Sequence, residues 1–120
     1  MTRAVRVILT GEAADEYEKL ARIAKEEQTK GIRNSNHQQL LNSIKRASEQ
    51  LNQDPQFGTP IPKALYRKAK MPVTNLWKVN LTGYWRMLYT ITGDKVEIIC
   101  YVLEICDHRK YDRIFGYMKK

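Results

Sequence analysis

Hydrophobic residues in the first half of the chain follow one strand pattern and then two helical patterns. Residues 3–9 read R-A-V-R-V-I-L, an alternation that predicts a strand ending at Thr10. Apolar residues at helical spacing then predict a helix over residues 12–28, which Thr10 can cap. A second helix is expected to begin at Ser35, with a capping-box glutamine three residues later, and to end at Asp54-Pro55. The apolar stripes are Ala13, Tyr17, Leu20, Ala21 and Ala24 in the first helix and His37, Leu40, Leu41, Ile44, Ala47 and Leu51 in the second.

The second half alternates apolar and polar residues in a way that predicts three consecutive strands. A stiff connection at residues 57–62 and a basic segment at residues 63–70, ambiguous between helix and loop, come before them. The strands are expected over residues 76–81, 85–92 and 96–105, with turns at Thr82-Gly83-Tyr84 and Gly93-Asp94 between them. The last strand is apolar on both faces, which predicts a central place in the sheet. On the first strand, one face carries Trp77, Val79 and Leu81, and the other carries Lys78 and Asn80. On the second strand, one face carries Trp85, Met87, Tyr89 and Ile91, and the other carries Arg86, Leu88 and Thr90.

These elements predict an α+β fold in the order β-α-α-β-β-β, an antiparallel sheet with the two N-terminal helices packed on one face. The chain of 120 residues is long enough for one modest core and too short for two, so residues 1–120 are expected to form a single domain.

Positive charge is concentrated in the second half of the chain. The net charge is +8. Residues 1–60 carry nine Lys and Arg against eight Asp and Glu, a difference of +1, whereas residues 61–120 carry twelve against five, a difference of +7. A basic half favours a polyanionic partner, of which nucleic acid is the commonest in the cytoplasm. The alternative is a basic surface that serves solubility only.

The sequence also predicts what this protein lacks. The start, MTRAVRVILTGE, has no apolar signal-peptide region, and no apolar stretch reaches the length of a membrane span. Cys100 and Cys106 lie on one expected strand, roughly 20 Å apart and so too distant for a disulfide. Two histidines 71 positions apart and two cysteines on a core strand face do not make a metal site. We therefore expect a reduced, cytoplasmic protein.

The last third of the chain resembles the C-terminal core of RelE-type toxins. In that family a strand with alternating basic residues turns into a strand with an aromatic–Arg pair, and a hairpin, an apolar strand and a tail with His, Arg and Tyr follow. The corresponding segments here are WKVNL at residues 77–81, YWRMLY at 84–89, Gly93-Asp94, and HRKY at 108–111. The helical half matches in order and length, so the resemblance to the RelE/ParE toxin superfamily spans nearly the whole chain.

This resemblance implies the toxin of a type II toxin–antitoxin pair, of the kind that stabilises plasmids. The implied activity is that of an mRNA interferase, a metal-independent endoribonuclease that cleaves messenger RNA on the ribosome. The expected partners are a cognate antitoxin protein, mRNA and the ribosome, with no cofactor, no metal and no membrane.

RNA cleavage of this kind uses the ribose 2′-OH as nucleophile, and it needs cations at the phosphate and groups that transfer protons. Arg86 is the first choice for the phosphate, because a guanidinium binds phosphate oxygens in a bidentate fork, and Lys78 would add charge. His108 is the candidate for proton transfer, with Tyr111 stacking on a base or assisting the transfer. Further RNA contacts are expected from Arg109, Lys110, Arg113 and Tyr117.

Alternatives remain open for the residues and for the function. Arg86 could instead pair with Glu97 or Asp107, His108 could cap the end of its strand, and the C-terminal tyrosines could pack on the sheet. Asn80 stands where ribosome-dependent relatives often have a second basic residue, and the spacing of the tail differs from the family pattern. A ParE-like poison of DNA gyrase and a non-toxic nucleic-acid-binding module on the same fold are the alternative functions.

Overall fold

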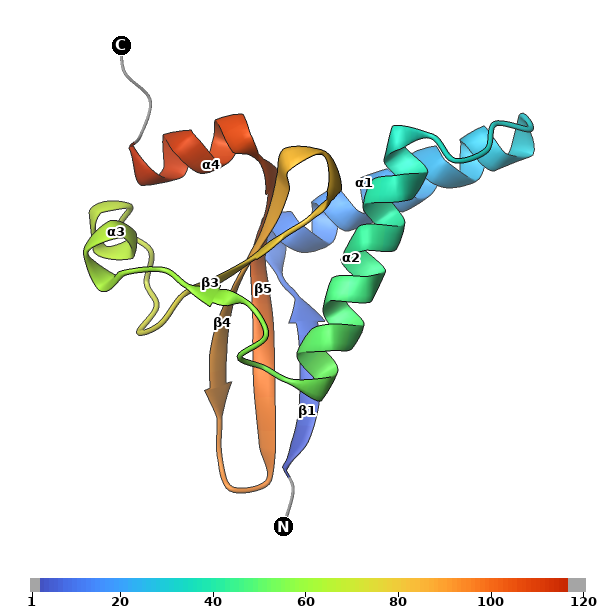
Figure 1. Cartoon of the computed structure of the whole chain (residues 1–120). Coiled ribbons are helices and arrows are strands. Elements are labelled where there is room, and N and C mark those ends of the chain that lie inside the picture. Colours follow the sequence, from blue (N-terminus) through green and yellow to red (C-terminus); the bar gives the residue numbers. More distant parts are fainter. Residues whose placement is uncertain (1–2, 117–120) are drawn as a thin grey trace.

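The computed structural model describes residues 3–116 as a five-stranded sheet with helices on both faces (Figure 1). The strand order across the sheet is β1-β5-β4-β3-β2. The expected α+β class is confirmed, and the long apolar strand β5 lies in the interior of the sheet, between β1 and β4. The strands are β1 (Ala4–Leu9), β2 (Thr59–Pro60), β3 (Trp77–Asn80), β4 (Trp85–Gly93) and β5 (Glu97–Asp107).

The sheet is mixed, which corrects the expectation of an antiparallel sheet. Strand β1 pairs with β5 in parallel, from Ala4 opposite Glu97 to Leu9 opposite Val102. All other neighbours are antiparallel, as expected for a meander. The apolar patterns of β1 and β5 show which faces these strands bury, but they do not fix the direction in which the two strands pair.

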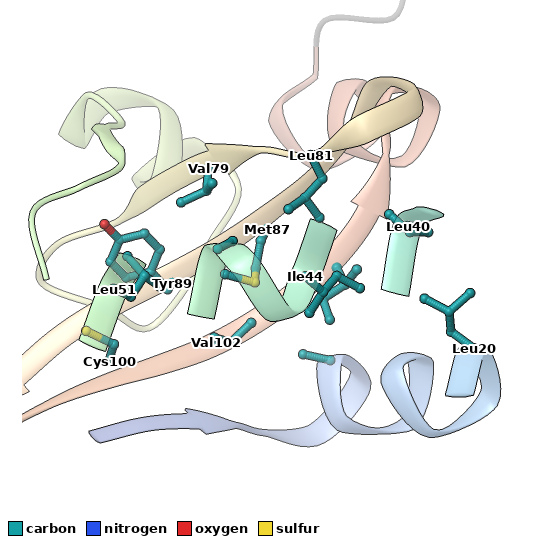
Figure 2. Close-up of a cluster of buried hydrophobic side chains, with 13 residues drawn as sticks. Leu20, Leu40, Ile44, Leu51, Val79, Leu81, Met87, Tyr89, Cys100 and Val102 are labelled. Atoms are coloured by element: carbon teal, nitrogen blue, oxygen red, sulfur yellow. The ribbon is translucent and has the colours of Figure 1, made fainter. Parts of the chain in front are cut away.

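Helices α1 (Gly11–Thr29) and α2 (Asn36–Gln53) cover one face of the sheet, as expected. Figure 2 shows side chains of α2, such as Ile44 and Leu51, packed against Met87 and Val102 of the sheet. The hydroxyl of Ser35 accepts a hydrogen bond from the Gln38 backbone N–H at 3.1 Å, so the predicted cap of α2 is confirmed. Thr10 makes no such cap for α1, because its hydroxyl donates to the Val102 carbonyl at 3.1 Å instead.

The opposite face of the sheet is covered by two short helices that the sequence did not clearly predict. Helix α3 (Lys63–Lys68) forms in the ambiguous basic segment, and helix α4 (His108–Phe115) forms in the tail. The Asp107 carboxylate caps α4 by accepting from the Lys110 backbone N–H at 2.9 Å. The second core is made of Ile61, Tyr66, Leu76, Leu88, Cys106, Tyr111 and Phe115.

A β-bulge in β5 changes which residues face α4. Tyr89 is paired with Val102 but Leu88 with Glu104, so one additional residue of β5 stands between the two pairs. Beyond the bulge the alternation is reversed. Cys106 packs in the second core, under α3 and α4 (the α3/α4 core), while Cys100 packs in the core between the sheet and the two long helices (the α1/α2 core). The two cysteines, expected on one face, are therefore on opposite faces, and both are free thiols.

Candidate functional site

Two cations from neighbouring strands lie over one aromatic ring of helix α4. The guanidinium carbon of Arg86 is 5.0 Å from the centroid of the Tyr111 ring, and Lys78 Nζ is 5.4 Å from it. Lys78 is opposite Leu88 and Asn80 is opposite Arg86, so Lys78 and Arg86 are diagonal neighbours on one face of the sheet. Helix α4 covers this face and buries the Tyr111 ring, which is 7% exposed. The structure thus brings three of the predicted site residues together.

The guanidinium of Arg86 has no carboxylate partner among residues 3–116. Glu97 pairs with Arg6 at 3.6 Å, and Asp107 caps α4, so neither of the alternative partners considered for Arg86 is engaged with it. Arg86 Nη1 donates to the Tyr84 carbonyl at 2.8 Å, while its Nε is buried and has no acceptor. A buried donor without a partner is costly in a folded protein.

Tyr84 connects Arg86 to the predicted proton-transfer residue. The Tyr84 and His108 rings meet edge to face with centroids 5.9 Å apart. Tyr84 is 76% exposed, and His108 is exposed as the first residue of α4. Tyr84 has φ = 63°, a left-handed conformation that directs its carbonyl to Arg86 and leaves its ring outside the core.

A hollow of about 350 Å³ lies beside these residues, at the end of β3 and the start of β4. The short 3₁₀ turn Thr82–Tyr84 forms one wall of it. We call it the Arg86 hollow, and its lining consists of Asn80, Leu81, Gly83, Tyr84, Trp85 and Arg86.

Lys110, a predicted RNA contact, is instead held by two carboxylates. Its Nζ lies 3.0 Å from Glu104 Oε1 and 3.1 Å from Glu12 Oε2. Burial raises the pKa of Glu104, whereas hydrogen bonds from the side chains of Glu104 and Lys110 lower the pKa of Glu12. The cluster joins the start of α1, β5 and α4, so in this arrangement Lys110 anchors the helix that carries Tyr111.

The remaining predicted RNA contacts are Arg109, Arg113 and Tyr117. Arg109 and Arg113 are exposed on α4, and neither forms an ion pair with another described residue. Tyr117 lies outside the described residues.

Sequence reasoning missed Tyr84, which it assigned only to a turn. The available signal was a large aromatic residue in a turn, where small and polar residues are usual, immediately before the strand of Arg86. It also missed Glu104, whose place beside Lys110 depends on the β-bulge.

Cys106 lies opposite Arg86 but is unsuited to act as a nucleophile. Burial raises the pKa of its thiol to about 12, so it stays protonated at neutral pH. Within residues 3–116, no three His, Cys, Asp or Glu side chains gather in a way that would hold a metal ion. No helix in the same range is both long and apolar enough to cross a membrane.

Comparison with known proteins gives a likeness in structure and none in sequence. No family model matches the chain, and no curated protein matches it. A solved structure described as a YoeB/ParE toxin from Agrobacterium tumefaciens superposes with a TM-score of 0.57 at 18% sequence identity. The match covers 86% of this chain and 98% of that one, so it concerns the whole fold and not a single motif.

Proposed function

The chain has the fold of the RelE/ParE toxin superfamily. We propose that it is the toxin of a type II toxin–antitoxin pair and that it cleaves messenger RNA on the ribosome without a metal ion. The observation that carries the proposal is the pair of cations on Tyr111. Arg86 and Lys78 converge there without a carboxylate partner among the described residues. Two unneutralised cations on one face suit a phosphodiester.

The cleavage step follows from the chemistry of RNA. The 2′-oxygen attacks the neighbouring phosphorus, the bond from phosphorus to the 5′-oxygen breaks, and the products are a 2′,3′-cyclic phosphate and a 5′-OH. Arg86 and Lys78 stabilise the additional negative charge on the phosphoryl oxygens. One proton leaves the 2′-OH and one is delivered to the 5′-oxygen, and His108 is the residue that we assign to this transfer.

Two aromatic residues have different proposed roles, Tyr111 in positioning the cations and Tyr84 in stacking on a base. The Tyr111 ring is buried beneath both cations, so it positions them and leaves no surface for a base. The exposed ring of Tyr84 takes over the stacking role that was expected of Tyr111. Arg109 and Arg113 add phosphate contacts along α4.

The proposed partners follow from the charge of the chain. A nuclease of this kind would damage its own cytoplasm, so a specific inhibitor is needed. With +7 in residues 61–120, the chain favours an antitoxin with an acidic segment that covers Arg86 and Lys78. Coexpression with each adjacent reading frame, followed by pull-down of this chain, tests for such a partner.

Expression in a bacterial host tests the activity. We expect growth arrest and new RNA ends bearing 5′-OH, and both should disappear in Arg86→Ala and in His108→Ala. Arg46→Ala, which removes an exposed arginine of α2 far along the chain from the site, serves as the matched control and should stay toxic.

Three outcomes would contradict the proposal. If Arg86→Ala and His108→Ala arrest growth as the parent does at equal soluble levels, the site is wrong. If RNA remains intact while DNA breaks accumulate, the ParE-like alternative replaces it. If expression is harmless and no adjacent reading frame gives a complex, a nucleic-acid-binding module remains.

A further inference from the structure

A second hollow lies next to the Arg86 hollow, between the start of α2 and the Thr82–Tyr84 turn. It measures about 300 Å³, and we call it the α2 hollow. Figure 1 shows the β3–β4 connection between α4 and the start of α2, and the Thr82 backbone N–H donates to Ser43 Oγ at 3.1 Å. The two hollows share Gly83 and Trp85, so they form one track around the turn. The α2 hollow is lined by Asn36, His37, Gln39, Leu40, Thr82, Gly83 and Trp85.

His37, which the sequence placed in the apolar stripe of α2, is exposed and lines this hollow. Its Nδ1 lies 3.0 Å from Glu27 Oε2, and the Ser35 hydroxyl donates to Glu27 Oε1 at 2.6 Å. These hydrogen bonds, that from Ser35 first, lower the pKa of Glu27, so its carboxylate is ionised and only accepts. Nδ1 must therefore carry the proton that it shares with Glu27. In the neutral ring, Nε2 is then an acceptor, on a side chain that is 50% exposed.

Gln39 is oriented in a similar way. Its Nε2 donates to the Asn34 carbonyl at 2.9 Å, which holds the amide group in place and leaves Oε1 as an acceptor. Asn36, the first residue of α2, is exposed and adds an amide that can donate or accept.

The opposite wall of the hollow offers an uncovered aromatic edge. A Cβ built on Gly83 would lie 3.8 Å from Trp85 Cδ1, so any side chain at position 83 would begin to cover the indole. Gly83 also has φ = 65°, which strongly favours glycine there. An aromatic wall opposite a polar rim is the usual environment of an unstacked RNA base.

We propose that the α2 hollow binds one unpaired base next to the scissile phosphate, and that it favours bases with an exocyclic amino group over uracil. The acceptors His37 Nε2 and Gln39 Oε1 match an amino group, which adenine, cytosine and guanine carry and uracil lacks. A volume of about 300 Å³ is at the lower end for small-ligand sites, which suits a single base. The inference rests on the proposed function in one respect, that the bound strand is RNA held at Arg86.

Binding of strands that cannot be cut separates this inference from cleavage. Short oligomers of deoxycytidine and of deoxyuridine lack the 2′-OH nucleophile. Their bases differ at C4, an amino group against a carbonyl oxygen, and at N3, which accepts in cytosine and carries a single N–H in uracil. We expect the parent to bind the deoxycytidine oligomer about fivefold more tightly by fluorescence anisotropy, the worth of about one hydrogen bond. The double variant His37→Ala/Gln39→Ala should bind both oligomers equally.

Three further variants make the result specific. Gln39→Ala alone leaves the Glu27–His37 hydrogen bond intact and should lose part of the preference, which guards against an effect of misfolding. Asn42→Ala, an exposed residue of α2 outside the hollow, should keep the parental preference. Arg86→Ala should weaken both oligomers by the same factor.

Each outcome decides between the two proposals. If the parent does not discriminate, or if the double variant keeps the preference, the base site is refuted even where RNA is cut in cells. If the parent discriminates through His37 and Gln39 but cuts no RNA, the base site stands and the proposed nuclease is refuted.

Discussion

Tyr84 has a left-handed backbone conformation, φ = 63°, that asparagine adopts more readily than tyrosine. For a bulky residue this conformation costs about 1 kcal/mol. The side chain is 76% exposed, so its replacement removes little buried area, and its edge contact with His108 contributes about 0.5 kcal/mol. We therefore expect Tyr84→Asn to raise the free energy of unfolding by about 0.5 kcal/mol, a rise in Tm of about 2 °C.

Activity should change in the opposite direction in the same variant. Stacking of a base on an aromatic side chain contributes about 1–3 kcal/mol, so loss of the ring should slow RNA cleavage at least about fivefold. Opposite signs distinguish a functional residue held in a strained conformation from a residue that only builds the turn.

The assay combines thermal unfolding of the purified chain with counting of 5′-OH RNA ends at equal soluble expression. Lys70→Asn is the matched control, because Lys70 also has a left-handed conformation, φ = 57°, and lies outside the site. It should gain stability and keep parental activity. A Tyr84→Asn variant that loses stability and activity together, or that cuts RNA at the parental rate, would refute the reasoning.

Three other predictions concern Arg86, the independence of cleavage from metal ions, and Lys110. Arg86→Lys keeps the charge but loses the guanidinium fork, so cleavage should fall at least about tenfold with the thermal stability of the fold little changed, and parental cleavage would show that charge alone suffices. Cleavage in the purified system should survive EDTA and leave 2′,3′-cyclic phosphate, and activity that needs added magnesium would exclude the 2′-OH mechanism. Burial raises the pKa of Glu104, and the Lys110 cation lowers it. Lys110→Ala removes that cation, so ionisation of Glu104 opposes folding as the pH rises above the ordinary pKa of 4.5. The free energy of unfolding of Lys110→Ala should lie about 2 kcal/mol below that of the parent at neutral pH, and the two values should converge below pH 4.5. A difference that does not depend on pH would contradict the role of Glu104.

Much of the fold was predictable because its elements have clear periodicities. The stripe from Leu40 to Leu51 and the alternation around Trp77 and Met87 identified the faces that form the α1/α2 core. Helix α4 was not recognised, because eight residues rich in charge give too short a stripe for a helical period to stand out. Its cap at Asp107 was a local signal that sequence reasoning did not use.

The site was predictable where it depended on simple alternation. Lys78 and Arg86 were placed on one face by counting along two strands, and the structure brings them together on Tyr111. Counting fails beyond the bulge in β5, where the alternation is reversed and Glu104 faces Lys110. A partner across three elements, such as Glu12 for Lys110, leaves no trace in a sequence pattern.

The parallel pairing of β1 with β5 also affects when the sheet can form during synthesis of the chain. During synthesis β1 and both long helices leave the ribosome first, but the partner of Ala4 is Glu97, 93 residues later in the chain. Until then α1 and α2 have no completed sheet to cover, and contacts between such distant residues form slowly. The cations of β3 and β4 must also wait for α4 to supply the ring on which they meet. A nascent chain interrupted before residue 97 therefore carries Lys78 and Arg86 without the strand and helix that bring them together, so this cluster forms only after α4 has been synthesised.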